Sequence, residues 1–219
     1  MPDVAHWAAF LAATVVFVLI PGPSVLYVVA QGIHGGFRAA RTSAAGLAAG
    51  DLVQVLAAAA GLSVVLASSA TLFTVLKYAG AAYLIYLGVR RLRDRDRPGP
   101  PAVPPPAGPA RTRDLLVQGF AVNALNPKTA LFFLALLPQF VAPDAGPAAG
   151  QVLALGTAFV ALGLASNLLF GRLGGAVSGL ARRSHRFRTG TRWVSGGTLI
   201  GLGVLAAVAG EPRRSGAYR

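Results

Sequence analysis

The feature that most constrains this chain is an apolar run over residues 5–30, interrupted by Pro21-Gly22-Pro23. The run carries no Lys, Arg, Asp or Glu, and about 20 apolar residues suffice for a helix to cross a bilayer. Proline lacks a backbone N–H and clashes with the preceding turn, so a continuous helix is not expected here. In hydrocarbon, a broken backbone is tolerated only against protein or a wet cavity. The interruption therefore predicts either a simple proline kink or a buried site.

Composition indicates an integral membrane protein. Hydrophobic residues make up 54% of the chain and charged residues only 12%, whereas a soluble domain has about 25% charged residues. The net charge of +13 would suggest nucleic acid in a soluble protein. Here the cations gather between apolar runs, so membrane lipids are the expected partners and nucleic acid is not. With no cysteine and three scattered histidines, no metal site and no cofactor are expected.

Six apolar segments are long enough to span a bilayer, which predicts an all-α fold with a single transmembrane domain over residues 1–219. They lie at about 5–30, 39–66, 72–90, 115–141, 150–170 and 193–209. A proline-rich stretch at about 93–113 is expected to be an extended cytoplasmic linker. It separates repeat 1, at about 5–92, from repeat 2, at about 114–209, and residues 210–219 are expected to be a disordered tail.

Arginine-rich connections predict the orientation in the membrane. The first, third and fifth connections are basic, whereas the second and fourth have neither Lys nor Arg. By the positive-inside rule the basic connections face the cytoplasm, and six spans then put both termini outside. The arginines of the tail, Arg213, Arg214 and Arg219, argue weakly against this.

A second interruption, Asn126-Pro127-Lys128, falls in the fourth predicted span. Two sets of three spans have opposite orientations, which is the condition for two inverted three-helix repeats, and both interruptions are then in the first helix of a repeat. With one gap, Asp51 also aligns with Asn167, although apolar helices align readily by chance. Paired interruptions in helices 1 and 4 predict a substrate site near the membrane midplane.

Polar residues inside the apolar runs are the candidate site residues, because a charge in hydrocarbon is costly and should face the bundle interior. Burial disfavours the Asp51 carboxylate anion, which suits this side chain to carry a proton; a structural partner for a cation is the alternative. Lys128 could bind a substrate carboxylate, pair with Asp51, or extend to the interface. The predicted substrate-binding residues are Pro21, Gly22, Pro23, Ser24, Asn123, Asn126, Pro127 and Lys128, and the predicted proton-coupling residue is Asp51.

The chemistry of two interrupted helices suits a zwitterion. A helix that begins near Pro23 or Pro127 presents free amide N–H groups and the positive end of its dipole to an anion. The free carbonyl groups of the preceding helix suit an ammonium group, and an amino acid carries both charges. A passive channel for small polar solutes is the alternative, because opposed half-helices also line pores.

Enzymatic function is not expected, and no catalytic residue is predicted. The sequence has no nucleophile-elbow pattern, no phosphate-binding glycine loop and no pair of intramembrane acids. Glycine-rich faces at Gly171, Gly175 and Gly179, and at Gly197 and Gly201, would allow a homodimer. The same glycines serve packing within one chain equally well, so the oligomeric state stays open.

Three motifs together resemble the LysE/RhtB family of amino-acid exporters, the LysE-type translocators. They are Pro21-Gly22-Pro23, the stretch KYAGAAYLIYLG at 77–88, and Asn126-Pro127-Lys128 followed by Phe132-Phe133 and Leu137-Pro138-Gln139-Phe140. The resemblance implies efflux of amino acids or related metabolites across the bacterial inner membrane, powered by the proton gradient. The chain departs from the family at Ile20, where Ser or Thr is common, and at Ser24, where Asn is common, which puts the identity of the substrate in doubt.

Overall fold

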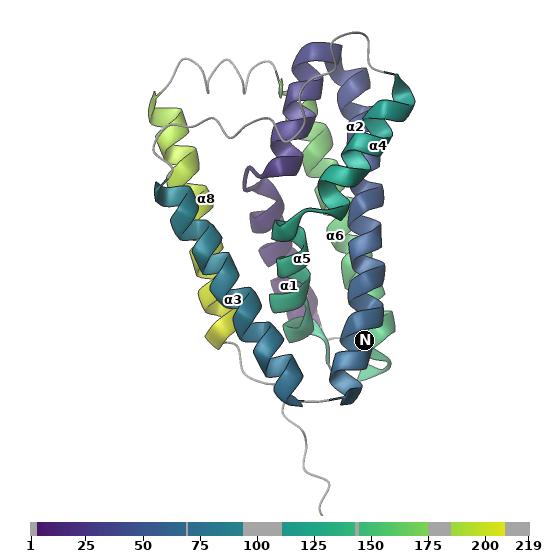
Figure 1. Ribbon diagram of the computed structural model, residues 1–219, viewed down its shortest axis with the longest axis vertical. Coiled ribbons are helices and arrows are strands. Elements are labelled where there is room, and N and C mark those ends of the chain that lie inside the picture. The colour runs from purple at the N-terminus through teal and green to yellow at the C-terminus, as the bar shows by residue number, and fades with distance from the viewer. Residues whose placement is uncertain (1–3, 69, 94–110, 143–144, 175–184, 209–219) are drawn as a thin grey trace, which may run out of the picture.

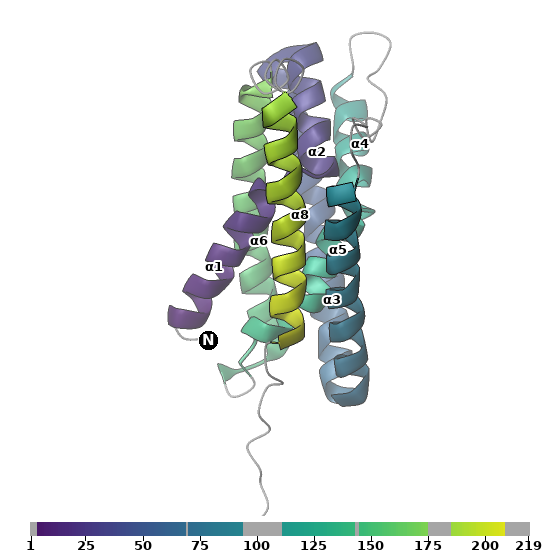
Figure 2. The ribbon, with the colours of Figure 1, turned by 90° about the vertical axis from the view of Figure 1, so that its left-hand side faces the viewer.

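The computed structural model describes residues 4–68, 70–93, 111–142, 145–174 and 185–208, and every regular element in them is helical. The elements are α1 (Val4–Leu19), α2 (Pro23–Ser68), α3 (Ala70–Arg93), α4 (Thr112–Ala124), α5 (Pro127–Ala135), the 3-10 helix η1 (Leu137–Phe140), α6 (Ala148–Arg172) and α8 (His185–Val208). The longer helices run along the long axis of the molecule (Figures 1 and 2). Most of the predicted linker, the predicted tail and the glycines at 175 and 179 fall outside the described residues.

The helix α2 consists of two legs that meet at Gly36. Glycine there has φ 67° and ψ −174°, outside helical geometry, in the left-handed region that glycine adopts without steric cost. The first leg rises from the middle of the molecule and the second descends along its side (Figure 1). The sequence predicted a connection between residues 30 and 39. These residues are instead helical except at Gly36, which alone reverses the direction of the chain.

Helical structure stops at both proline motifs, as the sequence predicted. The helix α1 ends at Leu19 and α2 begins at Pro23, which we call the first break. The helix α4 ends at Ala124 and α5 begins at Pro127, which we call the second break, and the axis bends there by 43°. Pro127 is at the first helical position, where its missing N–H costs no helical hydrogen bond.

Long apolar helices support a membrane protein. By length and composition, Pro23–Gly61 and Ala148–Arg172 are each able to cross a membrane, and the bent pair α4–α5 makes a third span if it is counted as one. This count concerns the described residues alone. The six-span arrangement with inverted repeats stays a prediction.

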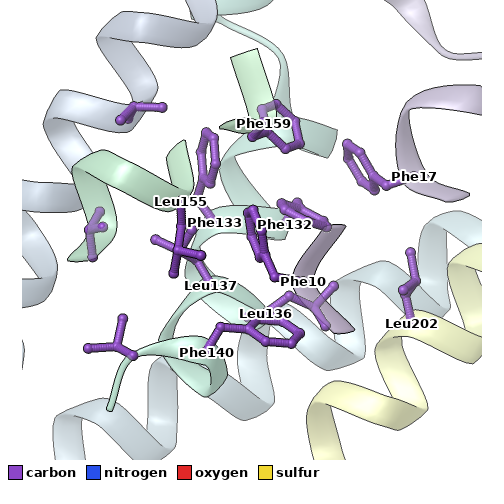
Figure 3. Close-up of a cluster of buried hydrophobic side chains, with 14 of the residues drawn as sticks. Phe10, Phe17, Phe132, Phe133, Leu136, Leu137, Phe140, Leu155, Phe159 and Leu202 are labelled. Atoms are coloured by element: carbon purple, nitrogen blue, oxygen red, sulfur yellow. The ribbon is translucent and has the colours of Figure 1, made fainter. Parts of the chain in front are cut away.

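Two buried apolar clusters lie on opposite sides of the breaks. The aromatic cluster, built mainly on α1, α5, η1 and α6, includes Phe10, Phe17, Phe132, Phe133, Phe140 and Phe159 (Figure 3). The small cluster consists of Tyr27, Val28, Ala40, Ala44 and Leu47 on the two legs of α2. The helices α1 and α5 extend to one side of the breaks, and α4 and the first leg of α2 extend to the other. The breaks therefore lie between the two clusters.

Close contact between α2 and α4 depends on glycine. A Cβ atom on Gly50 would lie 2.6 Å from the Phe120 carbonyl oxygen, and one on Gly119 would lie 2.5 Å from the Ser43 carbonyl oxygen. Only a residue without a side chain lets the two backbones approach this far. This packing carries the second leg of α2, and Asp51 with it, against the second break.

Candidate functional site

A cavity of about 30 Å³, lined by both polar and apolar residues, lies where the two breaks meet. Its polar lining comes from α2, α4, α5, α6 and the second break: Ser24, Asp51, Asn123, Asn126, Lys128, Thr129 and Asn167. Phe17, Val18 and Phe159 form much of the apolar wall. This volume is enough for about two water molecules, so an amino acid would require the surrounding helices to move apart.

The first break is closed by the side chain of Lys128. Its Nζ atom donates hydrogen bonds to the carbonyl oxygens of Phe17, at 3.1 Å, and Ile20, at 3.0 Å. The same atom lies 4.1 Å from the centroid of the Phe17 ring. These carbonyl groups lie at and just beyond the end of α1, where the helix has no next turn; the Phe17 oxygen also accepts from the Ile20 backbone N–H at 3.3 Å. A charged donor from α5 therefore completes the carboxyl end of α1.

Two further residues contribute to this arrangement. The Ser166 hydroxyl group of α6 donates to the Val18 carbonyl oxygen at 3.2 Å. A Cβ atom on Gly22 would lie 3.5 Å from Nζ of Lys128, an ordinary contact, but only 3.3 Å from Cδ, which is tighter than most real Cβ contacts. Glycine between the two prolines thus leaves room for the lysine side chain.

The second break is closed by Gln54, a residue of the second leg of α2. Its Nε2 atom donates to the carbonyl oxygens of Asn123, Ala124 and Asn126, at 2.5, 3.3 and 3.2 Å. Gln54 is only 8% exposed. A neutral amide therefore adds a side-chain donor at the second break, where the Asn123 and Asn126 carbonyl oxygens also accept from the backbone N–H groups of Asn126 and Ala130.

A hydrogen-bonded chain of polar side chains joins the two breaks. Ser24 at the start of α2 donates to Asn123 Oδ1 at 2.5 Å, and Asn126 Nδ2 donates to Ser24 Oγ at 3.3 Å. Asn123 Nδ2 in turn donates to the Leu47 carbonyl oxygen at 3.1 Å. Asn126 Oδ1 accepts from the Lys128 backbone N–H and so caps α5. The same two asparagines hold the breaks together and line the cavity.

Asp51 has an unpaired oxygen at the cavity. The residue is 3% exposed, and its Oδ1 atom has no hydrogen-bond partner. A Cβ atom built on Gly163 of α6 would lie 3.7 Å from Oδ2. A buried polar atom without a partner is costly. Among the described residues, no group of three or more His, Asp or Glu side chains gathers as metal ligands.

Comparison with known proteins places the chain in a family. The sequence profile of the LysE type translocator matches residues 15–210. The chain belongs to this family. A relative from Vibrio cholerae named "Uncharacterized membrane protein" is 32% identical over 210 residues, which is 94% of this chain and 98% of the relative. No solved structure matches this translocator.

Two relatives carry names that state an activity. The homoserine/homoserine lactone efflux protein of Salmonella typhi is 33% identical over 150 residues, covering 68% of this translocator and 71% of the relative. The leucine efflux protein of Klebsiella pneumoniae is 30% identical over 142 residues, covering 63% and 64%. The family resemblance read from the motifs is thereby confirmed, and transport and efflux are the activities of the named relatives.

Six of the nine predicted site residues line the cavity of this translocator: Gly22, Ser24, Asp51, Asn123, Asn126 and Lys128. The three prolines do not line it; they shape the breaks. Sequence reasoning missed Gln54 and gave Asn167 no role in the site. A polar residue three positions after Asp51, on the same face of the helix, was the signal for Gln54.

Proposed function

We propose that this translocator exports amino acids or related small metabolites across the bacterial cytoplasmic membrane by proton-coupled alternating access. The observation that carries the proposal is the cavity between two broken helices, with one acid and one lysine among its lining residues. Broken helices at such a site are typical of secondary transporters. The names of the efflux relatives support amino acids as the substrate class.

The proposed membrane arrangement is the six-span one. Repeat 1 and repeat 2 would cross the membrane three times each with opposite orientation, and both termini would lie outside. Support comes from the two breaks, one in the first helix of each repeat, and from the Asp51 and Asn167 pair, because both residues line the cavity. The two repeats would move against each other about this cavity.

The proposed substrate contacts use the start of α2 and Lys128. The first turn of a helix has backbone N–H groups without helical partners, and its dipole favours an anion. An ammonium group has three N–H donors, and Lys128 uses two of them on α1, which leaves one for a substrate carboxylate. The amide oxygens of Asn123 and Asn126 already accept from Ser24 Oγ and from the Lys128 backbone N–H, and each would use its second lone pair for the substrate's ammonium group. Asp51, whose Oδ1 has no partner, would carry the coupling proton.

A passive channel is the competing function, and the site argues against it. An open pore needs a continuous polar path, whereas buried apolar clusters lie on both sides of the breaks. A channel also has no need for a buried acid. Export of homoserine or leucine against its gradient, abolished by a protonophore, supports the transporter, and export that only ever runs downhill contradicts it.

The coupling role of Asp51 is tested in proteoliposomes that contain the full chain. Asp51→Asn is expected to lose at least 90% of substrate accumulation driven by a pH gradient while keeping exchange of labelled for unlabelled substrate. Asp114→Asn is the matched control, because Asp114 is an exposed acid in the first turn of α4. Full gradient-driven accumulation in Asp51→Asn would show that the proton is carried elsewhere.

A further inference from the structure

The carboxyl end of α1 has the composition of a binding site for a monovalent cation. Two backbone carbonyl oxygens, of Phe17 and Ile20, converge on one point, and the face of the Phe17 ring covers it at 4.1 Å. The negative end of the helix dipole adds to the attraction, and an aromatic face contributes a cation–π interaction. Carbonyl groups at a broken helix end commonly hold the coupling cation of a transporter.

The cation found between these two carbonyl oxygens is a side chain of the protein itself, the ammonium group of Lys128. We propose that the carboxyl end of α1 is a monovalent-cation site whose resident cation is the ammonium group of Lys128. The lysine is tethered on α5, beyond the second break, so the site is filled without an ion from solution. The transport consequence, which rests on the proposed function, is that this protein needs no Na⁺.

Removal of the tethered ammonium group should leave a vacant site for a free cation. Lys128→Ala removes the charge and opens space beside Gly22 and the two carbonyl oxygens. Lys128→Met also removes the charge but fills the space with an uncharged chain of similar length. The first variant should bind an added small ammonium ion, whereas the second should not.

The test is thermal unfolding of the purified full chain with methylammonium chloride, NaCl or tetramethylammonium chloride at equal ionic strength. Methylammonium is expected to raise the Tm of Lys128→Ala, by about 3 °C at ten times its Kd. The effect should saturate and be absent in wild type and in Lys128→Met. NaCl distinguishes a general monovalent-cation site from one selective for N–H donors, and tetramethylammonium has no N–H to donate. The control Ser166→Ala removes a neutral donor to α1 and should show no response to methylammonium.

The outcomes of the Tm measurement decide as follows. No difference between methylammonium and tetramethylammonium for a folded Lys128→Ala overturns the proposal. If that variant folds only when the cells and buffers contain methylammonium, the proposal is supported. If that variant folds in neither salt, the wild-type protein is tested instead, by exchange of labelled leucine or homoserine with choline in place of Na⁺. Unchanged exchange supports the proposal, and exchange that requires Na⁺ contradicts it. Because the Tm measurement needs no transport, failure of the export proposal would leave this result intact.

Discussion

Both breaks leave helix carbonyl groups that need hydrogen-bond donors, and the side chains that donate to them differ in charge. Each ends a helix inside the molecule, where the last carbonyl groups lack the full set of N–H partners that a continuous helix would supply. At the first break the main donor is the charged Lys128; at the second it is the neutral amide of Gln54. Each donor comes from the other half of the chain, so each break depends on contact between the halves. A charged donor can be replaced by another cation, whereas a neutral amide cannot. We therefore expect the first break, but not the second, to respond to an added small cation once its own donor is removed.

The largest expected effect is that of Lys128→Met. Loss of a charged donor from two carbonyl groups should destabilise the fold by about 3 kcal/mol and reduce export at least a hundredfold. Unfolding and export assays of the variant check both values. If export persists with only the stability changed, Lys128 is a structural cap like Gln54 and the contrast between the breaks disappears.

A smaller effect is expected for Gln54→Met. Three carbonyl oxygens then lose their shared donor, which should cost about 2 kcal/mol, with a roughly tenfold fall in export rate because Asn123 and Asn126 shift. Added methylammonium should not restore either property, since no cation has been removed. Gln54→Asn, which keeps a shorter amide, is the control and should recover part of the stability. Rescue of Gln54→Met by a small cation would mean that both breaks are cation sites.

The smallest effect is expected for Ser166→Ala. This variant removes one neutral hydrogen bond, to the Val18 carbonyl oxygen, which is worth about 1 kcal/mol. Export and its dependence on the pH gradient should stay within twofold of wild type. A loss comparable to that of Lys128→Met would indicate that any donor to α1, charged or neutral, matters equally.

The positions of the breaks could be predicted from the sequence because proline acts locally. Pro21, Pro23 and Pro127 each disturb the interior of a helix, because proline lacks the backbone N–H and clashes with the preceding turn. Which donor completes each break could not be predicted, because that depends on contacts between residues far apart in the chain, such as Lys128 with Phe17. The same limit explains why Lys128 was assigned several partners and Gln54 was overlooked. The turn at Gly36 was also missed, since one left-handed glycine leaves hardly any trace in hydropathy.

Thiol labelling tests whether the two breaks form one water-accessible substrate site. The chain contains no cysteine, so single-cysteine variants need no prior engineering. Ser24→Cys places a thiol at the cavity, and Leu26→Cys places one two residues away on a side chain that is 42% exposed on the outer face of α2. A charged thiosulfonate reagent should label Ser24→Cys, and homoserine or leucine should slow that reaction while leaving Leu26→Cys unaffected. Two results would contradict a shared substrate site at the breaks. One is labelling of Ser24→Cys that no amino acid in a full panel slows, and the other is no labelling at all in a transport-active variant.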